Sequence, residues 1–172
     1  MNKIRIVALL CITILAMLIP ACKVSYSFQG TSIDYNKVKT MEIRDFANQS
    51  SLVYAPLAII FNENLKDMFT RNTKLSFVEA GGDMELEGEI VRYDLTPMAV
   101  KEDAFASETR LTMAVRIRFR NNVDPTQDKE ETISAYRDFP SDKSLDSVQD
   151  ALIEELNKEI IDQIFNVTLS NW

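Results

Sequence analysis

The amino-acid sequence predicts an α+β fold, in which two helices pack on one face of a four-stranded, mostly antiparallel sheet. Two stretches, residues 56–72 and 148–167, carry apolar side chains at spacings of three and four, as a helix with one buried face does. Alternating apolar and polar residues predict strands at residues 38–46, 84–93, 109–120 and 131–139. The order strand, helix, several strands, helix lets one helical layer cover one face of the sheet.

The first 21 residues have the organisation of a secretory signal peptide. Lys3 and Arg5 make the start positive, and an apolar run follows over residues 6–19. This run is shorter than the roughly 20 apolar residues that a transmembrane helix needs. We therefore expect residues 1–21 to be a removed leader and not a membrane span.

The end of this leader predicts lipidation. Ala21 has the small side chain expected before the cut, Ile19 is aliphatic, and Cys22 follows at once, as in bacterial lipoproteins. Pro20 departs from the small residue that is usual at its position. Cys22 is the predicted lipidation site, and residues 22–37 are the predicted lipidated segment that ties the domain to a membrane. In the alternative interpretation, an ordinary signal peptide is cut elsewhere and Cys22 is a chance thiol.

Length and charge limit the mature chain to a single acidic domain. Removal of the leader leaves 151 residues, enough for one domain, which we place at residues 38–172. Two basic residues and no acidic ones leave with it, so the formal net charge changes from −7 to −9. This balance argues against general binding to nucleic acid. No disulfide is expected, because Cys11 leaves with the leader and Cys22 would be acylated.

The residue types that most catalytic sites need are missing. The chain has no histidine, which excludes Ser-His-Asp sites, Cys-His sites and histidine-bearing zinc sites. Gly81-Gly82 and Gly88 do not match a phosphate loop or a dinucleotide fingerprint. Carboxylate chemistry stays open, but neighbours such as Glu154 and Glu155 point apart on a helix and are explained as a solvated face. We expect no enzyme and no cofactor.

The first strand and the first helix follow from local patterns. In the strand at residues 38–46, the predicted inward residues are Met41 and Ile43, and the predicted outward residues are Glu42 and Arg44. Pro56 suits a first helical turn, and the helix is expected to end near Asn72. Its apolar stripe consists of Leu57, Ile60, Phe61, Leu65 and Met68.

The middle of the chain predicts a turn and two long strands. Gly81-Gly82-Asp83 predicts the turn after a short apolar segment at residues 75–78, because paired glycines allow positive φ. Residues 94–107 form either an extension of the strand at residues 84–93 with a bulge, or a functional loop. The strand at residues 109–120 points Leu111, Met113, Val115, Ile117 and Phe119 inward.

The last strand and helix close the domain. Ile133 and Ala135 lie on one face of the strand at residues 131–139. Ser144 is the predicted cap of the final helix. The apolar stripe of this helix consists of Val148, Leu152, Leu156, Ile160, Ile164 and Val167. Trp172 is expected to fold back on the core or to contact a partner.

Three arginines on the outward face of one strand form the candidate binding site. They are Arg116, Arg118 and Arg120, and guanidinium groups match phosphate oxygens. The preceding strand places Glu85, Glu87 and Glu89 on the same outward face. Cross-strand ion pairs with these carboxylates are the competing explanation. Both explanations stay open, and they can hold at different ends of the strand.

Three stretches of the mature chain are informative when they are considered together: VSYSFQGTSI at residues 24–33, GGDMELEGEI at residues 81–90, and Arg118-Phe119 ahead of Asp124-Pro125. In this order and spacing they resemble the Bacteroidetes branch of the LptE family of lipopolysaccharide-assembly lipoproteins. The similarity covers essentially the whole mature chain, and the order and spacing of these stretches are more specific than any one of them.

The resemblance implies a fold, a location and partners. The family fold is two helices on one side of a four-stranded sheet. The implied protein is an outer-membrane lipoprotein on the periplasmic face, which acts as the plug and assembly partner of the β-barrel LptD and inserts lipopolysaccharide into the outer leaflet. The implied partners are therefore an LptD-like barrel, lipopolysaccharide and the membrane through a lipid anchor. The family's basic lipopolysaccharide contacts match no residue here one by one, so the three arginines rest on strand alternation alone.

A second hypothesis retains the lipid anchor but assigns no β-barrel partner to the chain. In it, the chain is a periplasm-facing lipoprotein that binds a lipid or another small ligand without a barrel partner. A monomer with an enclosed apolar cavity would favour this hypothesis over the first.

Overall fold

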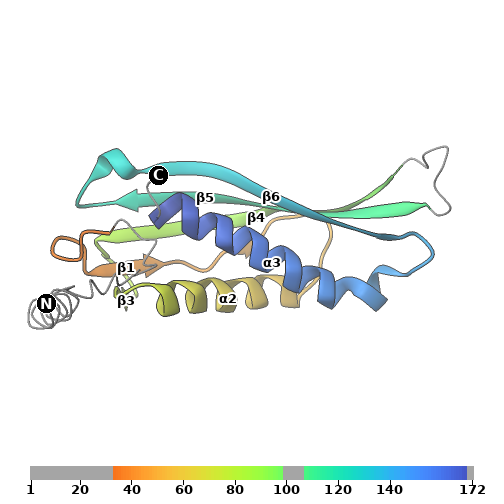
Figure 1. Ribbon diagram of the computed structural model, residues 1–172, viewed down its shortest axis with the longest axis horizontal. Helices are drawn as coiled ribbons and strands as arrows, with labels where there is room; N and C mark the ends of the chain where they lie inside the picture. The colour runs from red at the N-terminus through yellow and green to blue at the C-terminus, as the bar shows by residue number, and fades with distance from the viewer. Residues whose placement is uncertain (1–32, 99–106, 170–172) are drawn as a thin grey trace, which may run out of the picture.

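A computed structural model describes residues 33–98 and 107–169 (Figure 1). The predicted signal peptide, Cys22 and Trp172 lie outside the described residues. The elements are β1 (Thr40–Ile43), β2 (Ala47–Asn48), α2 (Pro56–Asn72), β3 (Ser76–Val78), β4 (Met84–Pro97), β5 (Glu108–Asn121), the 3₁₀ turn η1 (Pro125–Gln127), β6 (Lys129–Pro140) and α3 (Leu145–Leu169). Neither described helix is long and apolar enough to cross a membrane.

Within the described residues, the strands form one mixed sheet of six strands, which corrects the prediction of four mostly antiparallel strands. The order is β3-β1-β4-β5-β6, and β2 pairs with β4 beyond the end of β1. β4, β5 and β6 form an antiparallel meander, whereas β1 is parallel to both β3 and β4, and β2 is parallel to β4. The parallel pairs have a simple cause: the chain passes through α2 between β1 and β3, and such a crossover returns the chain in the same direction.

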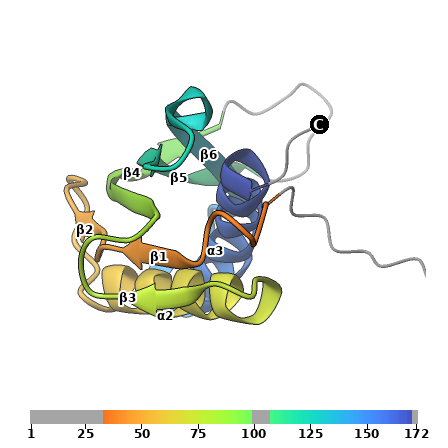
Figure 2. The same ribbon diagram turned by 90° about the vertical axis from the view of Figure 1, so that its left-hand side faces the viewer.

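One hydrophobic core joins both helices to one face of the strands. From α2 it contains Leu57, Phe61, Leu65 and Phe69. On β5, all five predicted inward residues are buried, and on β6 so are Ile133 and Ala135. Figures 1 and 2 show α3 lying alongside β6, with α2 next to β1 and β3. For the part of the chain that the structure describes, the predicted α+β class with two helices is therefore confirmed.

The buried faces of the two helices differ in detail from the predicted stripes. In α2, Phe69 is buried and Met68 is only partly buried. In α3, the buried face includes Ile153, Ile161 and Phe165, while Val148, Leu152 and Val167 pack only at its margin. Three polar side chains, Gln149, Asn157 and Thr168, are also buried in α3. The amide of Gln149 donates to the hydroxyl of Tyr93 on β4 at 2.7 Å.

β4 and β5 form a long ladder that continues beyond the predicted strand end. Pairing runs from Met84 with Asn121 to Pro97 with Thr109, and the register shifts between Ile90 and Arg92. Of the two interpretations of residues 94–107, the strand extension is therefore correct as far as Pro97, with the bulge slightly earlier in the strand. Residues 99–106 lie outside the described residues.

Gly88 on β4 leaves room for the ring of Phe46, which lies in the segment between β1 and β2. A Cβ atom at Gly88 would collide with the ring of Phe46 and with the backbone carbonyl of Arg116. The ring of Phe46 is buried, and it lies 5.5 Å from the ring of Phe61 on α2, centroid to centroid. The missing side chain at Gly88 thus lets Phe46 connect β4 to α2.

Candidate functional site

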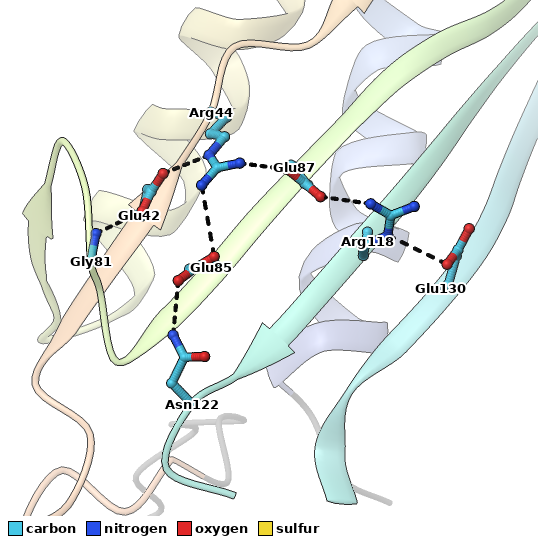
Figure 3. A network of polar contacts seen from close by, with 8 residues as sticks. All are labelled: Glu42, Arg44, Gly81, Glu85, Glu87, Arg118, Asn122 and Glu130. Atoms are coloured by element: carbon cyan, nitrogen blue, oxygen red, sulfur yellow. Dashed lines mark hydrogen bonds and ion pairs between the residues drawn. The ribbon is translucent and has the colours of Figure 1, made fainter. Parts of the chain in front are cut away.

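The candidate site lies on the outer face of the sheet, which is the face directed away from α2 and α3. Figure 3 shows both helices behind the strands that carry its side chains. The ladder places the three predicted arginines opposite three glutamates: Arg116 faces Glu89, Arg118 faces Glu87, and Arg120 faces Glu85. Strand alternation alone had predicted this juxtaposition of a basic and an acidic column.

Arg44 on the loop after β1 is the centre of a charge network on this face (Figure 3). Its guanidinium donates to Glu42 at 2.6 Å and to Glu87 at 2.8 Å, and it lies 3.8 Å from Glu85. The Glu42 side chain is only 4% exposed, and it also accepts from the N–H of Gly81 at 2.9 Å. The bond from Arg44, followed by the backbone donors of the Gly81-Gly82 turn, lowers the pKa of Glu42 despite its burial.

Arg118 extends this network across the sheet to β6. It donates to Glu87 on β4 at 2.9 Å and to Glu130 on β6 at 3.4 Å. These two carboxylates raise the pKa of the Arg118 guanidinium above its usual range. Arg116 forms a separate ion pair with Glu89. Cross-strand ion pairing therefore describes both Arg116 and Arg118.

Arg120 differs from the other two arginines. It is exposed, and it has no ion pair with any residue in the described ranges 33–98 and 107–169. Glu85, which faces it in the ladder, instead accepts from the side-chain amide of Asn122 at 2.9 Å and approaches Arg44. The structure thus leaves one of the three predicted guanidinium groups available to an external anion.

A second cluster lies on the outer face toward the β4–β5 hairpin. Arg110 forms a two-pronged ion pair with Asp138, at 2.7 and 2.8 Å, and its guanidinium carbon lies 3.7 Å from the centre of the Tyr136 ring. Arg92 pairs with Asp94 at 2.7 Å. Neither Arg92 nor Arg110 was predicted as part of the site. Arg110 continues the predicted outward alternation of β5, whereas Arg92 points outward only because the register shift between Ile90 and Arg92 reverses the alternation along β4.

Glu42 and Arg44 were also missed as parts of the site. Both were predicted to point outward, which is correct, but the burial of Glu42 depends on the turn at Gly81 and on β4. These segments are about 40 residues away along the chain, so no local pattern could indicate the contact.

Comparisons with known proteins agree with this fold. In solved structures, the chain is similar to a hypothetical protein from Chlamydia trachomatis, with a TM-score of 0.51 and 11% identity over 78% of this chain and 99% of that one. It is also similar to a protein from Xanthomonas campestris, with a TM-score of 0.51 and 13% identity over 77% and 84% of the two chains. At these identities the likeness shows the fold alone. No curated protein is significantly similar in sequence.

A family model provides the assignment that these structures do not. The model for lipopolysaccharide assembly, LptE, matches residues 38–168, which include every described helix and strand from β1 to α3 except the last residue of α3. The match covers both charged clusters of the outer face and every buried core residue except Leu169. This chain therefore belongs to the LptE family of lipopolysaccharide-assembly lipoproteins, whose members are not enzymes.

Proposed function

We propose that this chain is an outer-membrane lipoprotein that acts as plug and assembly partner of an LptD-like β-barrel, and so takes part in inserting lipopolysaccharide into the outer leaflet. The observation that carries the proposal is the family match over residues 38–168. The composition supports it, because an acidic domain without histidine suits an assembly component better than a hydrolase.

The predicted anchor supports the membrane location. Eleven residue steps separate Cys22 from Ile33, where the described domain begins. A fully extended chain spans about 3.3–3.6 Å per residue, so this connection reaches at most about 40 Å. Lipidation of Cys22 would therefore keep the domain close to the periplasmic face of the outer membrane.

Labelling with a radioactive fatty acid tests the anchor. We expect the wild-type chain to incorporate label and the Cys22→Ala variant to lose both the label and its membrane association. Unchanged membrane association of Cys22→Ala would show that the leader has been misinterpreted.

Co-purification tests the barrel partnership. A tagged chain extracted in mild detergent is expected to bring down a large outer-membrane β-barrel in a stable complex. Recovery of the chain as a monomer, without any such barrel, would contradict the proposal and favour the hypothesis of a barrel-free ligand-binding lipoprotein.

Within this function, Arg116, Arg118 and Arg120 were predicted to contact lipopolysaccharide, and we now place the main contact at Arg120. Arg116 and Arg118 already pair with carboxylates, so an incoming phosphate would have to displace them, whereas Arg120 needs no such exchange. With purified lipopolysaccharide as the probe, Arg120→Glu is expected to weaken binding at least fivefold. The matched control is Arg71→Glu, which reverses an exposed arginine on α2 and is expected to change binding less than twofold. Equal binding by wild type and Arg120→Glu would refute the contact.

A further inference from the structure

The two edges of the sheet differ greatly in length. β3, at one edge, has three residues, whereas β6, at the other edge, has twelve and, within residues 33–98 and 107–169, pairs only with β5. A long edge strand presents a row of unpaired N–H and C=O groups on which another strand can form. The β6 edge is therefore the place where the described sheet could be extended.

The hydrogen-bond pattern identifies the groups that β6 directs to this edge. The N–H of Ser141 donates to the carbonyl of Ser107 at 3.0 Å, so these two residues form a hydrogen-bonded pair. The register of β5 and β6 continues from this pair without a shift. Because hydrogen-bonded pairs alternate along an antiparallel ladder, odd-numbered residues of β6 bond to β5. Even-numbered residues of β6 direct their N–H and C=O groups away from β5, in the plane of the sheet and toward its edge.

The sequence at the centre of this edge lacks the charged residues and prolines that usually protect an edge strand against pairing. Residues 132–136, Thr-Ile-Ser-Ala-Tyr, include no charged residue and no proline, and the side chains of Thr132, Ser134 and Tyr136 are exposed. Within the described ranges, only the carbonyl of Tyr136 has a further partner at the edge, the guanidinium of Arg137 at 2.8 Å. Charged residues and proline appear only at the two ends of β6.

The surroundings of the edge determine which charge an added strand should carry. α3 packs over β6 on the inner face, and it contains six carboxylates and one lysine. Two of these carboxylates, Glu155 and Glu159, border the edge, where Arg137 reaches them at 2.6 and 2.7 Å and where they remain 60% and 41% exposed. Glu131 on β6 is exposed on the same side and has no ion pair with a described residue. An added strand would place alternate side chains beside these acidic groups.

We propose that the free edge of β6 is a docking site for an extended, basic segment of a partner protein, which adds a seventh strand at residues 132–136. The backbone of Thr132, Ser134 and Tyr136 provides the hydrogen bonds, as in other cases of strand addition. Lysine or arginine at alternate positions of the incoming segment pairs with Glu131, Glu155 and Glu159. The inference goes beyond the proposed function, on which it depends only for the identity of the natural partner.

The test uses the full chain and two synthetic heptapeptides, one alternating valine with lysine and one alternating valine with glutamate. Amide hydrogen exchange is measured by NMR with and without each peptide. We expect the lysine peptide to slow exchange at Thr132, Ser134 and Tyr136 at least tenfold and to leave Ile133 and Ala135 unchanged. The glutamate peptide is expected to bind at least tenfold more weakly.

A proline substitution at Ser134 tests the edge of β6 without removing a hydrogen bond between β6 and β5. Ser134→Pro removes an N–H that β5 does not use, and proline is tolerated on an edge strand where its N–H would face solvent. We expect this variant to bind the lysine peptide at least tenfold more weakly, and the matched control Ser134→Ala to bind within twofold of wild type. If Ser134→Pro does not fold, the exchange measurement on the wild-type chain decides alone.

Three results would overturn the inference. They are unchanged exchange of the three amides at saturating lysine peptide, wild-type binding by a folded Ser134→Pro variant, and protection of these amides without peptide in a chain that sediments as a dimer. The last result would mean that a second copy occupies the edge. Because the peptides replace the partner, none of these results depends on co-purification of a barrel, so failure of the docking site and failure of the proposed function can be told apart.

Discussion

Replacing Asn157 by leucine should stabilise the domain. Asn157 is completely buried on α3, between the buried residues Ile153 and Ile161, and neither polar atom of its amide has a hydrogen-bond partner among the described residues. Burying an amide without a partner costs about 1–3 kcal/mol in proteins. Asn157→Leu removes this cost and adds apolar contact in the core. We expect the free energy of unfolding to rise by about 1–3 kcal/mol, and at about 2–4 °C per kcal/mol the melting temperature to rise by about 2–12 °C.

Urea titration and a thermal melt of the full chain measure this effect. Leucine is larger than asparagine, so the control is Asn157→Ala, which removes the unpartnered amide without crowding the site. If Asn157→Leu lowers the free energy of unfolding and Asn157→Ala does not, leucine overpacks the site. A loss of stability in both variants would refute the reasoning, because it would mean that the amide of Asn157 has a favourable partner in the folded chain.

Two other substitutions test one contact in the core and one on the outer face of the sheet. Gly88→Ala drives a methyl group into the Phe46 ring and the Arg116 carbonyl, so the free energy of unfolding should fall by about 1–3 kcal/mol in a urea titration; unchanged stability would contradict this packing. In Glu42→Gln, the free energy of unfolding should decrease less in acid than it does in the wild-type chain. Because the folded-state pKa of Glu42 is lowered, its contribution is fully present above the ordinary value of 4.5 and disappears as the pH falls through the lowered pKa. Urea midpoints from about pH 6 to about pH 3 should therefore drop more steeply in the wild-type chain than in Glu42→Gln, and parallel curves would refute the assignment.

Elements with a long periodic pattern were predicted well from the sequence. The helix at Pro56–Asn72 has the predicted bounds, and β5 matches its predicted strand to within one residue at each end. Both are long enough to show their period over several turns or alternations. β3 is only three residues long and shows no period, so its place beside β1 could not be read from the sequence. Its parallel orientation depends on the α2 crossover, which is a property of the whole chain.

The candidate site was predictable only in the part that strand alternation determines. Alternation placed an arginine column beside a glutamate column, and the ladder confirms that arrangement. It could not show that Arg44 takes up part of the negative charge of Glu85 and Glu87, because that contact joins strands far apart in the chain. Consequently, the difference between the paired Arg118 and the unpaired Arg120 emerges only from the structure.

The order of strands in the sheet affects the order in which the parts of the domain fold. β4, β5 and β6 pair with their neighbours in the chain, whereas Met41 of β1 pairs with Met84 of β4, 43 residues further on. Closing a long loop costs more entropy than closing a short one, so the meander can form while β1 and α2 are still unfolded. Among the described strands, β1 is thus synthesised first but finds its place late. A chain lipidated at Cys22 on emerging from the inner membrane would complete its folding only after it is already attached to a bilayer.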